Sequence, residues 1–243
     1  MQKIKEYIID RPVLYNFFVR IKLLFDSFFQ AISKKEIAEY LVTKQPLILE
    51  IGANVGSDTV EMAVLWPQGK IYAFEPVPDV VERLKFKTKN FKNVEIVQSA
   101  VSDKSEAEAT EMFISDNSSC SSSLLKPKDH LIYYPTVHFD KKITVSTVFL
   151  PTWLEKNNLK MIDLLWIDVQ GAELNIFRSL ADEIKNIHYI YTEVSLKEFY
   201  EGGASFGSLK EYLGKFGFYI VKTDLVGNQL MGNVLFGQKN WVQ

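Results

Sequence analysis

Short apolar runs alternate with segments of helical periodicity along most of the chain, beginning at Leu47. Parallel strands that are buried on both faces are almost continuously apolar, whereas the helices between them repeat apolar residues every three or four positions. The pattern therefore predicts an α/β domain with a largely parallel sheet. The expected strands are 47–51, 70–74, 94–97, 143–148, 162–169, 187–194, 219–223 and 234–236, and the expected helices are 57–65, 79–89, 172–180 and 208–215, with a short helix after Pro151.

The first 40 residues have a different pattern, in which apolar side chains recur at helical spacing between Arg11 and Ile32. Arg20, Lys22 and Asp26 interrupt the segment, which excludes a helix that spans a bilayer, and no signal-peptide cleavage pattern follows. We expect an N-terminal amphipathic helical extension over residues 1–40. Its wide apolar face packs against the domain, against a second copy of the chain, or against a membrane surface.

The stretch from 110 to 140 has neither the strand nor the helix period and contains the serine-rich run 117–125. Two interpretations fit this composition: a lid that closes over an active site, and a polar connector. Tyr133 and Tyr134 within the stretch are candidates for contact with a substrate.

Composition narrows the class of protein. The chain has 243 residues, 47% of them hydrophobic and 24% charged, which is typical of a globular domain. A net charge of −2 gives little support to sequence-independent nucleic-acid binding. The single cysteine, Cys120, excludes an intrachain disulfide, so the expected location is the cytoplasm, with membrane-peripheral contact as the further option.

A glycine-containing turn follows the first strand of the domain. Gly52 permits close approach of a ligand to the backbone, and Gly56 permits the next helix to pack against the sheet. Glu75, at the end of the second strand, is placed to accept hydrogen bonds from ribose hydroxyls. The middle glycine of the dinucleotide fingerprint is replaced by Asn54, which favours S-adenosylmethionine (SAM) over a nicotinamide cofactor.

Six segments, in order, resemble the FkbM family of SAM-dependent methyltransferases. They are LILEIGANVG at 47–56, YAFEPVPD at 72–79, VEIVQSAVSD at 94–103, SSSLL at 121–125, LLWIDVQGAE at 164–173 and YTEVSLKEFYEGG at 191–203. The resemblance implies an α/β class I SAM-dependent methyltransferase (Rossmann-like) fold for residues 41–243, with a seven-stranded, mostly parallel sheet whose last strand is antiparallel. It also implies methyl transfer to oxygen, often on sugars or secondary metabolites.

The resemblance further implies which residues bind SAM. The methionyl and ribose parts would lie on the turn, the ribose hydroxyls on Glu75, the adenine beside Ser99 and Ala100, and the transferred methyl beside Asp168. The full set of expected cofactor-binding residues is Glu50, Gly52, Ala53, Asn54, Gly56, Glu75, Pro76, Ser99, Ala100 and Asp168. Many relatives have Asp-Val-Glu-Gly where this chain has Asp168-Val169-Gln170-Gly171, so residue 170 supplies neither a base nor a carboxylate ligand.

Three residues are candidates for activating an acceptor hydroxyl: Asp168, Glu193 and His138. The two carboxylates follow strands at the carboxyl edge of the sheet, where ligands bind. His130 and His188 are weaker candidates, and we expect no metal site because the carboxylates are not densely clustered.

The predicted function is thus an O-methyltransferase acting on a sugar hydroxyl in a small-molecule or glycan acceptor. A nicotinamide-dependent oxidoreductase and a non-catalytic SAM-binding domain are the alternatives.

Overall fold

A computed structural model describes residues 6, 8–29, 32–105, 109–116, 119–225, 227 and 229–241. Parts of the expected N-terminal extension (1–5, 7, 30 and 31) and of the serine-rich run (117 and 118) lie outside the described residues, as do the side chains of 26–29.

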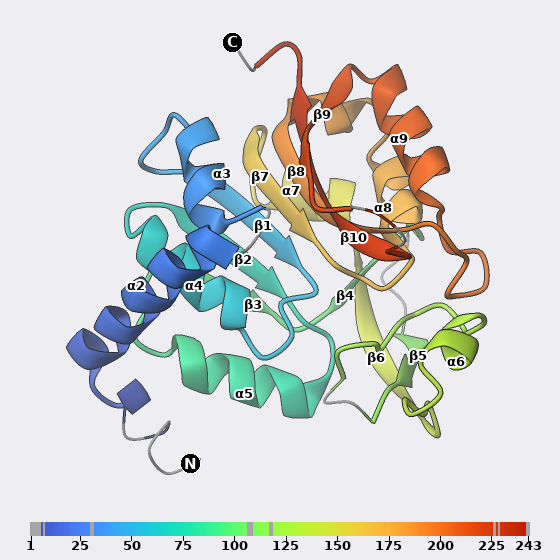
Figure 1. Cartoon of the computed structure of the whole chain (residues 1–243), viewed down its shortest axis with the longest axis horizontal. Coiled ribbons are helices and arrows are strands. Elements are labelled where there is room, and N and C mark those ends of the chain that lie inside the picture. The colour runs from blue at the N-terminus through green and yellow to red at the C-terminus, as the bar shows by residue number, and fades with distance from the viewer. Residues whose placement is uncertain are drawn as a thin grey trace.

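The centre of the molecule is a seven-stranded sheet with the strand order β3-β2-β1-β7-β8-β10-β9 (Figure 1). Its strands β3, β2, β1, β7 and β8 pair in parallel, while β10 is antiparallel to both of its neighbours. This confirms the expected mostly parallel sheet with an antiparallel last strand. The strands are β1 (Leu47–Ile51), β2 (Lys70–Phe74), β3 (Val94–Val97), β7 (Ile162–Ile167), β8 (Ile187–Ser195), β9 (Phe218–Thr223) and β10 (Met231–Gln238).

Helices cover both faces of this sheet (Figure 1). Because side chains alternate along a strand, Ile48 packs toward α3 and α4, whereas Leu49 and Ile51 pack on the opposite face toward α7 and α8. Most helices begin and end within two residues of the predicted bounds. They are α3 (Lys34–Tyr40), α4 (Ser57–Leu65), α5 (Pro78–Thr88), α7 (Leu150–Lys156), α8 (Glu173–Leu180) and α9 (Phe206–Lys215), with a 3-10 turn η1 (Ala181–Asn186).

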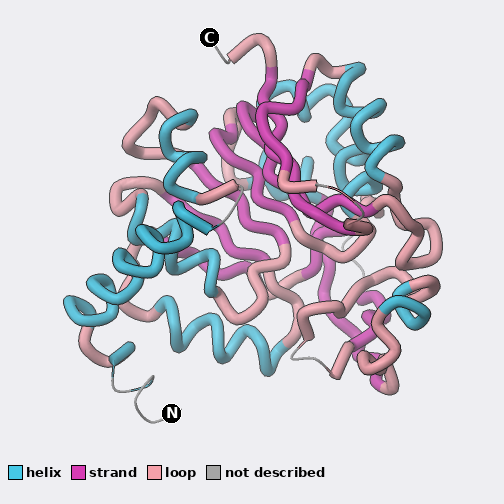
Figure 2. The backbone as a smooth tube through the Cα atoms, in the orientation of Figure 1, coloured by secondary structure: helices cyan, strands magenta, loops and turns pink. Residues whose placement is uncertain are grey.

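The molecule has a second, three-stranded sheet, of which the sequence predicted only the strand at 143–148. It has the order β4-β6-β5 and comprises β4 (Ala100–Ser102), β5 (Ala109–Ile114) and β6 (Lys141–Phe149), with the short helix α6 (His130–Tyr133) nearby. In Figure 2 the loops that follow the central strands lie between the two sheets. The described part of the 110–140 stretch therefore forms a wall beside the carboxyl edge of the main sheet.

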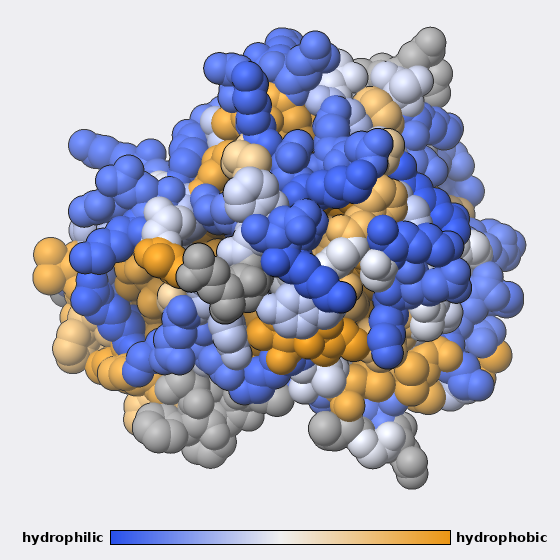
Figure 3. Space-filling view, turned by 90° about the horizontal axis from the view of Figure 1, so that it is seen from above, coloured by the Kyte–Doolittle hydropathy of each residue, from blue (hydrophilic) through white to orange (hydrophobic). Residues whose placement is uncertain are grey.

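The N-terminal extension forms helix α2 (Pro12–Phe29), and one of its faces packs on the domain. Val19 and Leu23 are buried against Val60 and Val64 of α4. A second face remains uncovered, with the large apolar side chains Val13, Phe17, Phe18, Leu24 and Phe25 exposed. Figure 3 shows hydrophobic surface at the left edge, on the side where Figure 1 places α2.

Only the face of α2 that carries Val19 and Leu23 thus packs on the domain. Contact of the outer face with a membrane surface or with a second copy of the chain stays a prediction. Among the described residues no helix has the length and apolar character needed to cross a bilayer.

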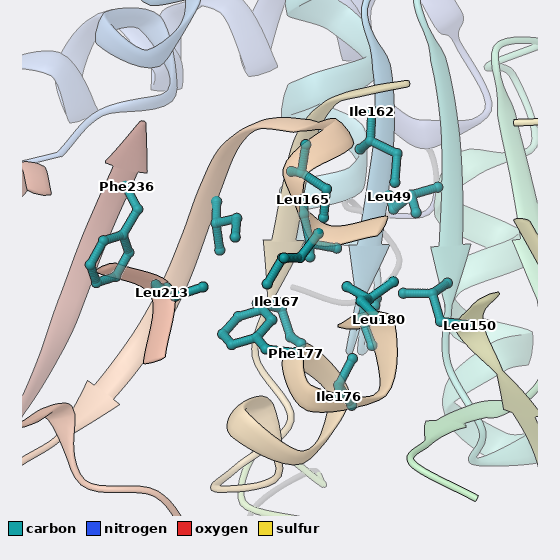
Figure 4. Close-up of a cluster of buried hydrophobic side chains, with 14 of the residues drawn as sticks. Leu49, Leu150, Ile162, Leu165, Ile167, Ile176, Phe177, Leu180, Leu213 and Phe236 are labelled. Atoms are coloured by element: carbon teal, nitrogen blue, oxygen red, sulfur yellow. The ribbon is translucent and has the colours of Figure 1, made fainter. Parts of the chain in front are cut away.

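The largest apolar cluster fills the space between the main sheet and α7, α8 and α9 (Figure 4). Phe177 of α8 lies in this cluster with Ile167 of β7 and Leu213 of α9, and all three are fully buried. The cluster fixes α8 against the strand that carries the site residues described below.

We expect Phe177→Ala to lower the free energy of unfolding by about 3–5 kcal/mol, because it leaves a cavity that rigid neighbours cannot fill. Phe17→Ala, at a position that is 57% exposed, is the matched control and should change it by less than about 0.5 kcal/mol. Urea denaturation monitored by circular dichroism measures both values. Equal effects of the two substitutions would contradict the packing described here.

Candidate functional site

A deep cavity of about 270 Å³ lies at the carboxyl edge of β1, β2 and β7. This is the position at which open α/β sheets bind ligands. Eight of the ten residues predicted from the sequence to bind a cofactor line it: Gly52, Ala53, Asn54, Glu75, Pro76, Ser99, Ala100 and Asp168.

The turn after β1 lies in direct contact with the end of β7. Gly52 has a φ of +91°, and a Cβ atom at this position would lie 1.9 Å from the carbonyl oxygen of Asp168. The backbone N–H of Asp168 donates to the carbonyl of Ile51 at 2.9 Å, which continues the β1–β7 pairing. Only glycine satisfies both the left-handed φ and this close approach.

Glu75 is fixed by backbone amides at the end of β2. Its Oε2 accepts from the N–H of Asn54 at 3.0 Å, and its Oε1 accepts from the N–H of Val77 at 2.9 Å. A carboxylate oxygen has a second lone pair, so each oxygen retains an acceptor site for a ligand hydroxyl. Burial raises the pKa of Glu75 to about 7, although these two hydrogen bonds oppose the rise.

Two predicted cofactor residues do not line this cavity. Glu50 is 1% exposed and points into the protein interior, and Gly56 packs against α5, where an added Cβ would lie 2.4 Å from Leu84 Cδ1. Gly56 therefore permits close packing between helices α4 and α5, whereas the sequence suggested packing against the sheet. The alternation along β1 explains Glu50: its neighbours Leu49 and Ile51 face the other side.

A second, more open cavity of about 370 Å³ adjoins the first. Asp168, Gln170 and Cys120 line both cavities, so the two spaces meet at these residues. The second cavity has its own wall, made of Ser121, His130, Tyr134, Val137, Glu193 and Met231.

Gln170 connects the two carboxyl groups at this junction. Its Nε2 donates to Asp168 Oδ1 at 2.7 Å and to Glu193 Oε2 at 3.0 Å. Its Oε1 lies 3.1 Å from the hydroxyl of Tyr200, and its backbone has a left-handed φ of 54°. An amide side chain, which carries two donors and an acceptor, is suited to this position between two carboxyl groups and a hydroxyl.

The two carboxyl groups are electrostatically coupled. Burial, and then the nearby charge of Asp168, raise the pKa of Glu193 to about 9. The protein around Asp168 likewise raises the pKa of its carboxyl group, which nevertheless faces the open cavity. Since two like charges at one site disfavour double ionisation, the pair retains a proton near neutral pH.

The serine-rich segment forms the wall between the cavities. Ser123 Oγ donates to the carbonyl of Gln170 at 2.9 Å, and the carbonyl of Ser121 accepts from the Tyr200 hydroxyl at 2.7 Å. Ser121 and Ser123 are both buried. These contacts anchor the described part of the segment to the residues around the junction.

The structure brings together only two of the three predicted catalytic candidates. Asp168 and Glu193 meet at the junction, but His138 is exposed, and its backbone N–H donates to Asp116 Oδ1 at 3.1 Å. His138 lines neither cavity, because its loop is turned toward β5 by this pairing. The histidine that does reach the second cavity is His130.

Sequence analysis missed Glu173 as a site residue. Glu173 Oε1 accepts from the N–H groups of Val169 and Gly171 at 3.0 and 3.2 Å and thereby holds the turn that carries Gln170. The sequence contains one indication of this role: an acidic residue, three positions after Gln170, begins a helix. Across the described residues, no group of three His, Cys, Asp or Glu side chains is arranged to hold a metal ion.

We expect buried Glu50 to make stability fall as pH rises. Its pKa is raised from 4.5 to about 8 by burial, so the folded state binds the proton that the unfolded state loses between these values. Relative to wild type, Glu50→Gln should become steadily more stable from pH 5 to pH 8, by up to about 1.4 kcal/mol per pH unit.

Thermal melting of both proteins across that pH range measures this difference. Glu155→Gln, at an exposed position, is the control and should track the wild type at every pH. A constant offset between Glu50→Gln and wild type would mean that Glu50 is ionised throughout.

Comparisons with known proteins agree with this geometry. The chain matches the model of the methyltransferase FkbM domain over residues 50–220. It is 32% identical over 192 residues to the 2-O-methyltransferase NoeI of Sinorhizobium fredii, covering 75% of this chain and 76% of that protein. It is also 27% identical over 184 residues to Methyltransferase 1 of Beauveria bassiana, covering 71% and 72% of the two chains.

Among solved structures, the methyltransferase FkbM from Methylobacillus flagellatus aligns with a TM-score of 0.48 at 9% identity, covering 80% of this chain and 44% of that one. The family match spans the deep cavity, the Gln170 junction and all of β8. The chain belongs to the FkbM methyltransferase family.

Proposed function

We propose that this protein transfers a methyl group from SAM to a hydroxyl group of a sugar, in a small-molecule or glycan acceptor. The observation that carries the proposal is the meeting of two cavities at Asp168 and Gln170. A transferase of this kind needs a donor and an acceptor on opposite sides of one point, aligned for in-line displacement.

The residues of the deep cavity fit SAM. Gly52 leaves its backbone open to the ligand, and Asn54 Oδ1 is enclosed without a hydrogen-bond partner among the described residues. Glu75 keeps free acceptor positions for ribose hydroxyls, and Pro76, Ser99 and Ala100 form the wall for the adenine. The donor, once bound, supplies an electrophilic methyl group and a good leaving group.

The second cavity suits a polyhydroxylated acceptor. Its wall combines hydrogen-bonding groups with the half-exposed ring of Tyr134, which offers a flat apolar surface. The relative NoeI is named a 2-O-methyltransferase, which supports oxygen as the atom that receives the methyl group. The net charge of −2 gives no support to a nucleic-acid acceptor.

Incubation of the full chain with methyl-labelled SAM and separate pools of nucleotide sugars, glycans, protein and nucleic acid tests the proposal. Label should appear in the carbohydrate pools as an acid-stable O-methyl sugar. Label in protein or nucleic acid would overturn the substrate class. SAM binding without transfer to any pool would favour a non-catalytic SAM-binding domain.

Glu75→Gln should weaken SAM binding by about tenfold or more, because the amide replaces one acceptor oxygen with a donor and removes the charge that strengthens hydrogen bonds to the other. Isothermal titration calorimetry measures the dissociation constant. Glu95→Gln, one strand further along and exposed, is the control and should bind SAM as the wild type does. Unchanged affinity in Glu75→Gln would place the ribose elsewhere.

A further inference from the structure

His130 lies in the wall of the second cavity, at the start of α6. The residue is 3% exposed, and its backbone N–H donates to the carbonyl of Phe199 at 3.1 Å. Its ring is surrounded by those of Tyr134, Phe139 and Tyr200, with centroids at 5.0, 5.2 and 5.5 Å. Backbone and ring contacts therefore hold the imidazole in one place.

The two ring nitrogens have different surroundings. Nδ1 is enclosed and has no hydrogen-bond partner among the described residues. This leaves Nε2 as the nitrogen available to the cavity that the ring lines. A polar ring atom that is buried among aromatic side chains without a partner costs free energy, so a ligand in the cavity can gain a hydrogen bond to this ring only at Nε2.

The carboxyl groups across the cavity are less available as bases. Both accept hydrogen bonds from Gln170 Nε2, and the pair retains a proton near neutral pH. An imidazole is the ordinary proton acceptor at neutral pH. Burial lowers the pKa of His130, which keeps the ring uncharged and able to accept a proton.

The titratable groups that face or flank His130 come from several elements. Tyr134 follows the end of α6, Tyr200 packs against the ring of His130 after β8, and Cys120, Asp168 and Glu193 line the same cavity. Burial, rather than any of these neighbouring groups, is the cause that lowers the pKa of His130.

We propose that His130 is the general base that takes the proton of the acceptor hydroxyl, an inference that rests on the methyltransferase function proposed above. In this step the acceptor oxygen bonds to the methyl carbon while the carbon–sulfur bond breaks, and its electron pair stays on sulfur. The acceptor O–H bond breaks, its electrons remain on oxygen, and the proton passes to Nε2. The positive charge thus moves from the sulfonium to the imidazolium, which later releases its proton to water.

The chain has only three histidines, which makes a matched comparison simple. His130→Gln should lower kcat for the labelled carbohydrate pool by about 10²–10⁴-fold, with SAM affinity unchanged. His138→Gln and His188→Gln are the controls and should retain wild-type kcat. The wild-type kcat/KM should fall at low pH as the base becomes protonated, and this limb should disappear in His130→Gln.

A second measurement does not depend on whether His130→Gln folds. In wild-type protein labelled with carbon-13 at histidine Cε1, one of the three signals should titrate below the ordinary value of 6.5, at the pKa of the kinetic limb. His138→Gln and His188→Gln each remove one of the other signals, which assigns the remaining one to His130.

Near-wild-type kcat in His130→Gln, or a kinetic limb that does not match the His130 titration, would overturn the proposal. Loss of kcat in His138→Gln with retention in His130→Gln would transfer the role to His138. Absence of transfer by the wild-type protein counts against the proposed function itself, so the two failures are distinguishable.

Discussion

The contact between Gly52 and the carbonyl of Asp168 is the constraint on which the site depends. Parallel pairing of β1 with β7 brings the ends of the two strands side by side, and any Cβ at residue 52 would overlap the Asp168 carbonyl oxygen. The missing side chain therefore does two things: it permits the strand ends to meet, and it leaves the floor of the deep cavity open. Because Asp168 is fixed by this contact, the turn that follows it also has a fixed position.

That turn includes Gln170, which lies where the two cavities meet. Gln170 adopts a left-handed backbone conformation, which costs free energy for a residue other than glycine. Bonds from Glu173 to the turn amides, from Ser123 to the Gln170 carbonyl and from Tyr200 to its side chain offset this cost. The Ser123 bond ties the serine segment to this turn, and the backbone pairing of Ser123 with Phe113 of β5 ties the small sheet to the same segment, so the wall between the cavities is continuous with the core.

Sequence periodicity predicted the large sheet well because its strands are buried on both faces and its helices on one. Of the small sheet it predicted only β6, as the strand 143–148. β5 is partly exposed and its residues lack a continuous apolar run, so antiparallel pairing with β6 decides its structure. Within the site, Glu75 and Asp168 were predictable because they end strands. Glu50 was not, because the face to which a strand residue points depends on the register of the neighbouring layers.

The sequence also could not predict which histidine reaches the site. His130 and His138 lie eight positions apart in one irregular segment, and nothing in their local sequence separates them. The difference arises from partners that are distant in the chain: Phe199 and Tyr200 enclose His130, whereas Asp116 holds the backbone of His138 outward. At position 170, in contrast, this chain has Gln where many relatives have Glu. The difference is visible in the sequence, but its structural consequence is not. Only the junction shows that a third carboxylate at position 170 would stand between two carboxyl groups, whereas the amide donates to both Asp168 and Glu193.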